Sequence, residues 1–486
     1  MRRLLLLMFT ACDWQHFALM NSIPLHGADN HAVHVYIGVD GLAHGAVNQA
    51  LQQGNLAGPN WHLAKMVSMF PGTSDASWSR ILHTQRINGY EYQYYDPSND
   101  KLHYTGYLGL LAHTVPPLDW SPVDEPEYIK AFDYFGNGYL DSLWKYHATE
   151  RSFGDSLDAF FYMLAGRGEV DHVVTGYFLE IDVLGHMQAR DETMHALLAL
   201  NARIKKFKGD HPERQYIFTL LSDHGMDFIS AKEDELVAFD EIMRQVGVAP
   251  VATFAEGRKT EGLFAVPVIH TRVSYLGLHT EPAMREAVAA RCSQSPTTDL
   301  VAAPLPSDND WRWFGVWRAG VQVLRFAYDP QNDTYILPQG LGYGDFGMTV
   351  RFSANEDYKT LSDEAAFALS RDGDYPDFLF RIQSAFAPLS VRYPADVLVS
   401  FKRPYASIGF QIPGGANAIA SAGFHGAIDD LASSGVLLTE ERDVPPVVRS
   451  DDFLGMFPQL RSHLQERGVA LRDDDPNVDL DYDAVP

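Results

Sequence analysis

The chain has 486 residues, of which 46% are hydrophobic and 21% are charged, a composition typical of a globular protein with a large core. It holds 38 Lys and Arg against 63 Asp and Glu, which gives a formal net charge of −25. Such a charge repels nucleic acid at long range, so a duplex-binding module is disfavoured. A small anionic substrate remains compatible with a site that carries its own cations.

The N-terminus has the pattern of an export signal. Two Arg are followed by the short apolar run 4–11 and then by Cys12, which predicts a signal peptide over 1–11. Phe-Thr-Ala-Cys at 9–12 resembles a bacterial lipobox, so we expect a lipid on Cys12, a tether over 12–32 and a periplasmic or membrane-anchored lipoprotein. A plain signal peptide and a buried N-terminal helix are the alternatives. Cys292 is the only other cysteine, so no disulfide framework is expected.

Buried strands alternate with helices in the first half of the chain. Short apolar runs predict strands, and segments with helical spacing of apolar residues lie between them. The strands are expected at 33–39, 66–70, 173–181 and 216–221, and the helices at 41–53, 74–84, 157–164 and 190–206. This alternation predicts an α/β fold with a mostly parallel central sheet and helices on both faces.

The second half is less regular. Residues 250–395 are expected to form an elaboration or cap, with a helix near 281–291 and a hairpin of 321–326 with 335–337. A Tyr-rich hairpin is expected over 90–107, and a loop-rich excursion over 113–150. Residues 396–401 are interpreted as a returning core strand and 447–466 as a closing helix. One catalytic domain would span 33–466, followed by an acidic tail over 467–486.

Polar residues follow the predicted strands. Asp40, Asp182, Asp223 and His224 stand at strand ends, where ligands bind in open α/β sheets. Ser74 follows a Pro-Gly break and opens a helix, and the N–H groups and dipole of a helix start favour a phosphate. An ordinary capped helix is the alternative interpretation of that stretch.

Two further histidines extend the set. His186 lies four residues after Asp182, and His425 stands in a Gly-Phe-His-Gly stretch where the backbone can approach closely. Three Asp and three His form a mixed oxygen and nitrogen set that suits Zn²⁺. Six such residues would serve two ions better than one, although each alone is also common as a cap or loop residue.

These motifs, in this order, resemble the alkaline phosphatase superfamily, and within it the type I phosphodiesterase/nucleotide pyrophosphatase branch. The matching stretches are Val-Asp-Gly at 39–41, Phe-Pro…Ser at 70–74, Glu-Ile-Asp…Gly-His at 180–186, Ser-Asp-His-Gly-Met at 222–226 and Gly-Phe-His-Gly at 423–426. The resemblance implies an alkaline phosphatase-like fold and a metal-dependent hydrolase of phosphoric esters. It implies two divalent ions, Zn²⁺ or Mn²⁺, and Ser74 as a nucleophile that forms a phosphoserine intermediate. One ion would be held by Asp182, His186 and His425, and the other by Asp40, Ser74, Asp223 and His224.

The chain also departs from the branch. The nucleophile there is usually Thr, with Pro-Asn two and three positions on, whereas Ser74 is followed by Ala76 and Ser77. The Asn amide that meets a phosphate oxygen is therefore missing, and Ser77 or Trp78 is expected to take its place. The sulfatase pattern Cys-x-Pro-x-Arg is absent from the sequence.

The expected substrate is a small phosphodiester. The nearest cations to Ser74 by sequence are Lys65 and Arg80, and helical spacing turns Arg80 away from Ser74. The aromatic residues at 90–107 and 311–317 either bury a leaving group or pack the cap. The alternatives are a phosphomonoesterase, a phosphomutase or transferase of the same superfamily, and a non-catalytic lipoprotein that binds phosphorylated ligands.

Replacing the lipobox cysteine tests the export hypothesis. Cys12→Ala should move the protein from the membrane fraction to the soluble fraction, because the lipid anchor would be lost. The measurement is fractionation with immunoblotting, and Cys292→Ala serves as the control that should not move. Mass spectrometry that finds an intact Met1 on the protein in cells would contradict the hypothesis.

Overall fold

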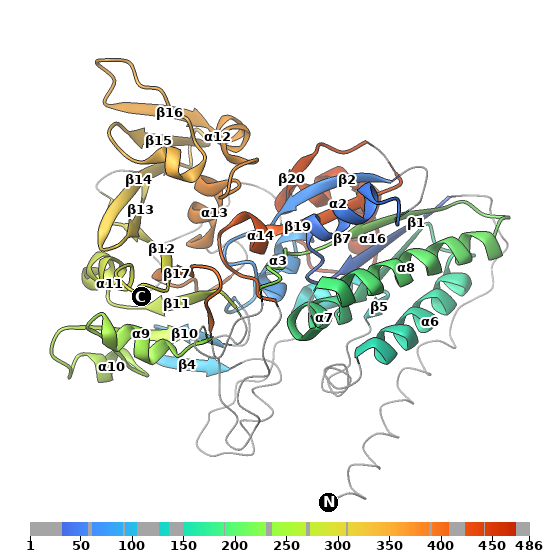
Figure 1. The fold of residues 1–486 in the computed structure, drawn as a ribbon, viewed down its shortest axis with the longest axis horizontal. Coiled ribbons are helices and arrows are strands. Elements are labelled where there is room, and N and C mark those ends of the chain that lie inside the picture. The colour runs from blue at the N-terminus through green and yellow to red at the C-terminus, as the bar shows by residue number, and fades with distance from the viewer. Residues whose placement is uncertain are drawn as a thin grey trace, which may run out of the picture.

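A computed structural model gives the fold (Figure 1). It describes residues 32–56, 61–90, 93–104, 126–135, 149–188, 190–229, 236–268, 273–307, 310–387, 391–407, 423–441 and 443–472. The predicted signal peptide, nearly all of the tether with Cys12, most of the 113–150 excursion and most of the acidic tail lie outside these residues. None of the described helices is long and apolar enough to cross a membrane.

The first lobe is built on a seven-stranded sheet. Six of its strands are parallel and β19 alone is antiparallel to its neighbours, which confirms a mostly parallel sheet. The strand order is β20 (Val447–Arg449), β2 (His62–Val67), β19 (Ser434–Thr439), β7 (Tyr216–Leu221), β1 (Val33–Val39), β6 (Val173–Phe178) and β5 (Tyr134–Phe135).

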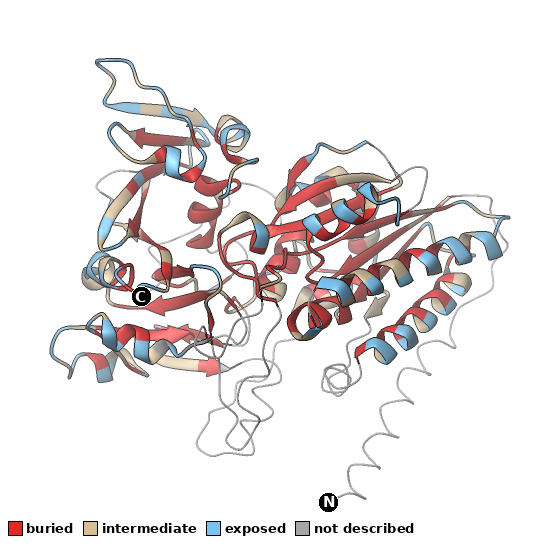
Figure 2. Cartoon of the chain, in the orientation of Figure 1, coloured by how far each residue is buried: buried red, intermediate tan, exposed pale blue. Residues whose placement is uncertain are grey.

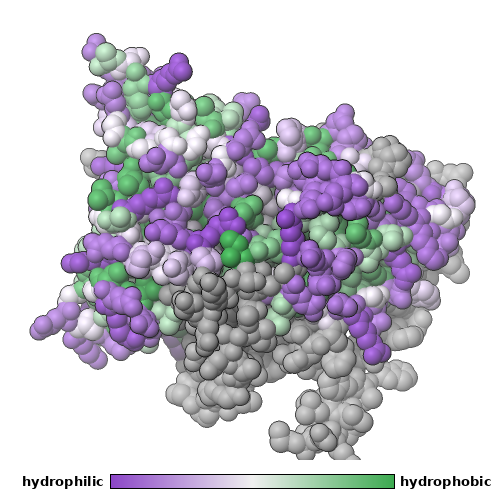
Figure 3. Space-filling model, in the orientation of Figure 1, coloured by the Kyte–Doolittle hydropathy of each residue, from purple (hydrophilic) through white to green (hydrophobic). Residues whose placement is uncertain are grey.

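Helices cover both faces of this sheet, because alternate residues of its strands point to opposite sides. Val35 and Ile37 of β1 pack with α2 (His44–Gln52), α6 (Thr149–Arg167) and α8 (Arg190–Asp210). Tyr36 points to the other face, toward α3 (Ser74–Ile81), α15 (Phe453–Met456) and α16 (Pro458–Glu466). Figure 2 shows the buried strands and the exposed outer surfaces of α6 and α8. Hydrophilic side chains cover much of the visible face of both lobes (Figure 3), in keeping with the charge of −25.

The second lobe holds a nine-stranded, mainly antiparallel sheet, at the left of Figure 1. Its order is β16 (Tyr358–Ser362), β15 (Thr334–Pro338), β14 (Val321–Asp329), β13 (Arg312–Arg318), β12 (Thr298–Leu305), β17 (Val397–Phe401), β11 (Tyr275–His279), β10 (Leu263–Val268) and β9 (Val248–Pro250). Its helices are α9 (Phe239–Gln245), α10 (Phe254–Gly257), α11 (Arg285–Cys292), α12 (Asp363–Ser370) and α13 (Phe378–Ala385).

The shorter elements lie outside the two large sheets. They are β3 (Gln93–Asp96) with β4 (Lys101–Tyr104), β8 (Leu236–Val237) with β18 (Ala406–Ser407), α7 (Glu180–Gln188), α14 (Asp430–Ser433) and the 3₁₀ helices η1 (Glu127–Ala131), η3 (Pro282–Met284), η4 (Tyr343–Phe346) and η5 (Ser450–Asp452). The hairpins expected at 90–107 and 321–337 and the helix near 281–291 are confirmed by β3–β4, β14–β15 and α11.

Two expectations about the central sheet were wrong, and one of its strands was missed. Residues 397–401 form β17, which pairs with β11 and β12 in the second sheet and not with the central one. The central sheet is instead completed by β19, which the sequence interpretation missed, and by β20, which occupies the first residues of the expected closing helix. The sequence interpretation therefore placed the returning core strand about 35 residues too early, because an apolar run does not specify the sheet that it joins.

A buried ion network joins the lobes at β20. Arg449 donates to both oxygens of Asp377 at 2.6 and 2.8 Å and to Asp363, and its guanidinium lies 4.2 Å from the ring centroid of Phe380. The carboxylates belong to the N-termini of α12 and α13 in the second lobe. An apolar cluster beside this network packs Met69 and Phe70 of the first lobe against residues of the second sheet and of α12 and α13.

Removing this arginine should destabilise the fold. Arg449→Met leaves two largely buried carboxylates without their cation, so we expect a loss of about 3 kcal/mol in the free energy of unfolding. Urea denaturation measures it. The matched control is Arg244→Met, whose exposed pair with Asp240 should be worth less than about 1 kcal/mol. Equal effects of the two substitutions would contradict the assigned role of the network.

Candidate active site

Ser74 is the first residue of α3, directly after the extended Thr73. Its Oγ donates to Asp40 Oδ1 at 3.2 Å and lies 3.4 Å from His224 Nε2. The hydroxyl of Thr73, the nearest alternative nucleophile, is instead held by the carbonyl of Tyr90 at 2.7 Å. The first N–H groups of α3 have no partner within the helix, and they lie at the same helix end as the Ser74 hydroxyl.

The ends of two neighbouring parallel strands supply the carboxylates nearest to Ser74. Asp40 follows β1 and Asp223 lies two residues after β7, and both are fully buried. Gly41, the residue after Asp40, adopts a φ of +64° and donates its N–H to Asp223 Oδ1 at 3.2 Å. A Cβ at Gly41 would lie 2.6 Å from an oxygen of Asp182, so only glycine allows this close approach.

Asp182 and His186 lie on one face of α7, one turn apart. Asp182 Oδ1 is 3.4 Å from His186 Nε2. The sequence interpretation placed Asp182 at the end of a strand, which is wrong, because β6 ends at Phe178 and α7 begins at Glu180. The expected proximity of the two side chains is confirmed, because residues i and i+4 of a helix are neighbours.

All three histidines are oriented by backbone carbonyls. His186 Nδ1 lies 2.8 Å from the carbonyl of Gly423, His425 Nδ1 lies 2.8 Å from that of Gly72, and His224 Nδ1 lies 2.9 Å from that of Gly225. A carbonyl only accepts, so each Nδ1 carries the proton and each Nε2 is left as a lone-pair donor. This arrangement is typical of metal-binding histidines.

The ligand-type atoms form two overlapping groups. Asp182, His224 and His425 make one group and Asp40, Asp223 and His224 make the other, with the atoms of each group within 4.8 Å of one another. His224 and His425 stack with ring centroids 3.8 Å apart. Asp182 Oδ1 and Asp223 Oδ2 are buried and accept no hydrogen bond from a described residue. Buried oxygens without donors, together with imidazole nitrogens, fit a divalent cation.

The carboxylates repel one another without a cation. Burial, and then the charges of Asp223 and Asp182, raise the pKa of Asp40, and burial with the charge of Asp182 raises the pKa of Asp223 to about 7. Groups that share a site in this way cannot all ionise near neutral pH unless positive charge is present.

The remaining predicted contacts differ in outcome. Arg80 is turned away from Ser74, as expected, and donates to Asp451 at 2.5 Å, while Lys65 pairs with Asp430 at 2.8 Å. Trp78 is wholly buried against Phe132 and Tyr177, so it does not reach a phosphate. Ser77 is also buried, and its Oγ has no hydrogen-bond partner among the described residues.

Two tyrosines and one aspartate of the site were missed. Tyr177 on β6 donates to Asp40 Oδ2, and Tyr128 of η1 donates to Asp75 Oδ1 at 2.8 Å. Burial, and then the carboxylates of Asp75, Asp40 and Asp223, raise the pKa of Tyr128. Tyr177 lies within an apolar strand and Asp75 within the first turn of a helix, where such residues are common, so the sequence carried no signal for either contact.

The expected aromatic residues pack the second lobe. Trp313, Phe314 and Trp317 enter three different apolar clusters around the second sheet, which favours cap packing over contact with a leaving group. In the 90–107 hairpin, the ring of Tyr94 stacks between His103 and Tyr393.

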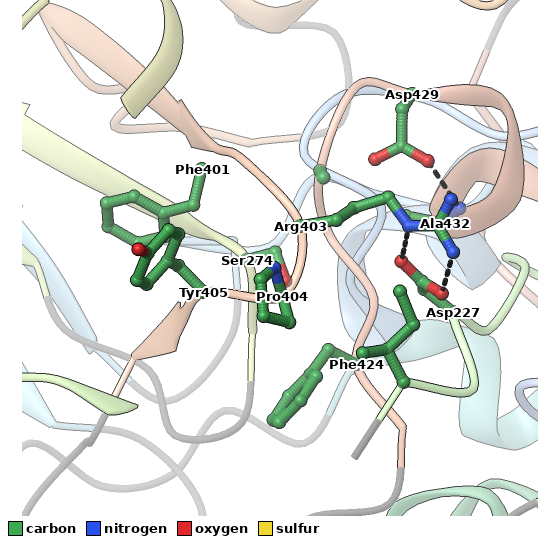
Figure 4. Close-up of a pocket in the computed structure, with 11 residues that line it drawn as sticks. Asp227, Ser274, Phe401, Arg403, Pro404, Tyr405, Phe424, Asp429 and Ala432 are labelled. Atoms are coloured by element: carbon green, nitrogen blue, oxygen red, sulfur yellow. Dashed lines mark hydrogen bonds and ion pairs between the residues drawn. The ribbon is translucent and has the colours of Figure 1, made fainter. Parts of the chain in front are cut away.

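A small cavity is lined by Phe424, the residue before His425 in the chain (Figure 4). Arg403 donates to both oxygens of Asp227 there, and Asp429 faces the same guanidinium. The cavity is about 10 Å³, enough for about one water molecule, so it is not a substrate pocket. Asp227 and Phe424 exchange backbone hydrogen bonds at 2.8 and 3.0 Å, so this ion pair supports the backbone next to His425.

The family model for type I phosphodiesterase/nucleotide pyrophosphatase matches residues 63–351, more than half of the chain. The chain therefore belongs to this family, as its motifs predict, and it is a hydrolase of the phosphodiesterase/nucleotide pyrophosphatase type. The match includes Ser74, Asp182, His186, Asp223 and His224, whereas Asp40 and His425 lie outside it.

The solved structures of murine ectonucleotide pyrophosphatase/phosphodiesterase 5, alone and as an inactive variant in complex with AMP, are similar to the chain. Each is 9% identical and is covered over 95% of its length, with 88% and 89% of this chain covered and TM-scores of 0.45 and 0.47. No curated protein matches the chain. The family assignment rests on the family model alone.

Metal removal should destabilise the protein in a pH-dependent way. The pKa of Asp223, about 7 in the folded chain against 3.8 ordinarily, means that the folded metal-free protein keeps a proton that the unfolded chain loses. Its free energy of unfolding therefore falls as pH rises from about 4 to 7. Bound cations offset the repulsion, so the Tm difference between metal-loaded and EDTA-treated protein should be larger at pH 8 than at pH 5.

Calorimetry of both forms at the two pH values checks this expectation, and re-addition of Zn²⁺ should restore the Tm. A Tm that EDTA leaves unchanged at both pH values would contradict a metal site among these residues. So would elemental analysis that finds no transition metal in active protein.

Proposed function

We propose that the protein is a two-metal phosphodiesterase that acts through a phosphoserine intermediate on Ser74. The observation that carries the proposal is the position of Ser74 Oγ. It stands at the start of α3, 3.2 Å from a carboxylate of Asp40 and 3.4 Å from Nε2 of His224. A nucleophile, a helix N-terminus and a cluster of ligand-type side chains thus meet at one point.

The residues fit two divalent ions, Zn²⁺ or Mn²⁺. Asp182, His186 and His425 would hold one, and Asp40, Ser74, Asp223 and His224 would hold the other, with His224 close enough to serve either group. When bound, such ions supply positive charge that favours the ionised serine and the charge on the phosphoryl oxygens.

The chain's own residues orient the reaction. Tyr177 donates to Asp40 Oδ2 and so leaves Oδ1 directed at Ser74 Oγ. The Gly72 carbonyl holds the ring of His425. This contact attaches the segment around His425 to the loop that precedes Ser74. Ser74 Oγ attacks phosphorus and the ester oxygen leaves; water then hydrolyses the phosphoserine. The first N–H groups of α3 are in place to stabilise oxygen charge in both steps.

The wider setting is part of the proposal. Both sheets would belong to one catalytic domain over 33–466, exported with the signal peptide 1–11 and anchored by lipid on Cys12 at the start of the 12–32 tether. Ser77 would contact a phosphate oxygen if its hydroxyl turns from its buried position. The substrate would be a small phosphodiester.

Replacement of the nucleophile is the direct test. Ser74→Ala should lower kcat for bis(p-nitrophenyl) phosphate by at least about 10³-fold, because the covalent route is lost, while metal content measured by elemental analysis largely persists. Thr73→Val is the matched control, since its hydroxyl bonds the Tyr90 carbonyl, and it should keep turnover. Wild-type-like activity of Ser74→Ala would rule out the mechanism.

A further inference from the structure

The positions of His186 and His425 depend on one short segment of the chain, residues 423–425. His186 Nδ1 donates to the carbonyl of Gly423 at 2.8 Å, and His425 lies two residues further on. A shift of this segment would therefore move both imidazoles together. Ligands of a metal ion must be held to within about 0.5 Å of their working positions, so the contacts that fix this segment matter for metal binding.

Single backbone bridges hold this segment on two sides. On one side, Phe424 and Asp227 exchange N–H···O=C hydrogen bonds at 2.8 and 3.0 Å. On the other side, the carbonyl of His425 accepts from the Ser274 N–H at 2.8 Å. Both are isolated bridges outside the named strands, so they lack the neighbouring rungs that reinforce a strand in a sheet. The position of Asp227 thus bears directly on that of Phe424.

An ion pair from the second lobe fixes Asp227. Arg403, which follows β17, donates from Nε to one carboxylate oxygen of Asp227 and from Nη2 to the other, the second at 2.7 Å (Figure 4). A contact at two points sets the direction of a carboxylate as well as its distance. Asp227 is buried, and Asp429 faces the same guanidinium, so Arg403 lies between two carboxylates.

The segment that carries ligands of the other proposed ion is held without Arg403. The Ser222 N–H donates to a carbonyl of β19 at 2.8 Å, and the Gly225 N–H donates to a carbonyl of α14 at 3.1 Å. Asp223 and His224 lie between these two bonds in the chain. Loss of the ion pair should therefore displace residues 423–425 and leave Asp223 and His224 in place.

We infer that Arg403 is a positioning residue for one of the two ions, the ion that Asp182, His186 and His425 would hold. The inference rests on the proposed function and assigns to the second lobe a selective part in it. Arg403 fixes Asp227, the backbone of Asp227 fixes residues 423–425, and this segment fixes the two histidines. The arginine acts on one ion and spares the other.

Arg403→Gln tests the inference, because it removes the charge and the two-point contact. Competition with a chromophoric chelator measures the dissociation constants for Zn²⁺. The wild type should bind two ions, and the variant should bind one with unchanged affinity and the other about tenfold more weakly, since outer contacts of metal ligands typically have effects of about this size or larger. In protein loaded with Co²⁺, the visible absorption of one ion should also change, which a loss of stability alone does not produce.

Arg285→Gln is the matched control. Arg285 pairs with Asp396, which directly precedes β17, whereas Arg403 follows the other end of the same strand. This substitution should lower the Tm and leave both zinc affinities unchanged. Arg403→Lys keeps the charge without the two-point contact, so its affinity for the weakened ion should lie between those of the wild type and Arg403→Gln.

Two results would overturn the inference and leave the proposed function intact. One is a folded Arg403→Gln protein whose affinities for both ions are unchanged, and the other is an equal loss of affinity for both. If Arg403→Gln does not fold, Asp227→Asn decides in the same way, because it removes the other charge of the pair and keeps the backbone bonds of Asp227. A wild type that binds fewer than two ions would instead refute the two-metal function itself.

Discussion

Mutual repulsion among Asp40, Asp182 and Asp223 is the constraint on which the site depends. The three carboxylates are buried together, and two of their oxygens accept no hydrogen bond from a described residue. A folded chain tolerates such a cluster only if protons or cations offset the charge. The imidazole Nε2 atoms directed at the same place favour cations. We therefore expect the metal-free protein to be less stable than the protein whose ligand-type atoms are occupied.

The candidate metal ligands come from both lobes, and the contacts between the lobes keep them together. Asp40 and Asp223 follow strands of the central sheet, and Asp182 lies in α7. His425 instead lies in a segment whose carbonyl accepts from the Ser274 N–H at 2.8 Å, directly before β11 of the second sheet. The Gly72 carbonyl orients its ring from the nucleophile loop. The Arg403–Asp227 ion pair and the Arg449 network hold the surrounding segments, so the second sheet is a structural part of the site.

The net charge of the chain is strongly negative, and the basic residues near the nucleophile in sequence do not offset it at the site. The net charge of −25 is spread over the whole chain, whereas the basic residues closest to Ser74 along the sequence are bound in ion pairs on other elements. In the described part of the site, the groups available to a phosphoryl group are therefore hydroxyls, backbone N–H groups and any cations that the carboxylates bind.

The sequence determined the strands whose apolar runs are short and bounded by turns. β1 and β7 were predicted at their observed limits, and the ends of both carry site residues, because parallel strands end on one edge of a sheet. The positions of Ser74, Asp40, Asp223, His224, His186 and His425 also followed from motif order. The continuous apolar run 173–181 did not reveal where β6 ends and α7 begins, since periodicity cannot separate a buried strand from the start of a buried helix.

Only the tertiary structure decided which sheet each later strand joins. β17 is as apolar as β19, yet it pairs in the second sheet, because pairing depends on contacts with strands about a hundred or more residues away in the chain. The contacts of Tyr177, Tyr128 and Asp75 were decided in the same way. Each residue is ordinary in its own segment, and each gains its hydrogen-bond partner only because folding brings a distant carboxylate or hydroxyl within reach.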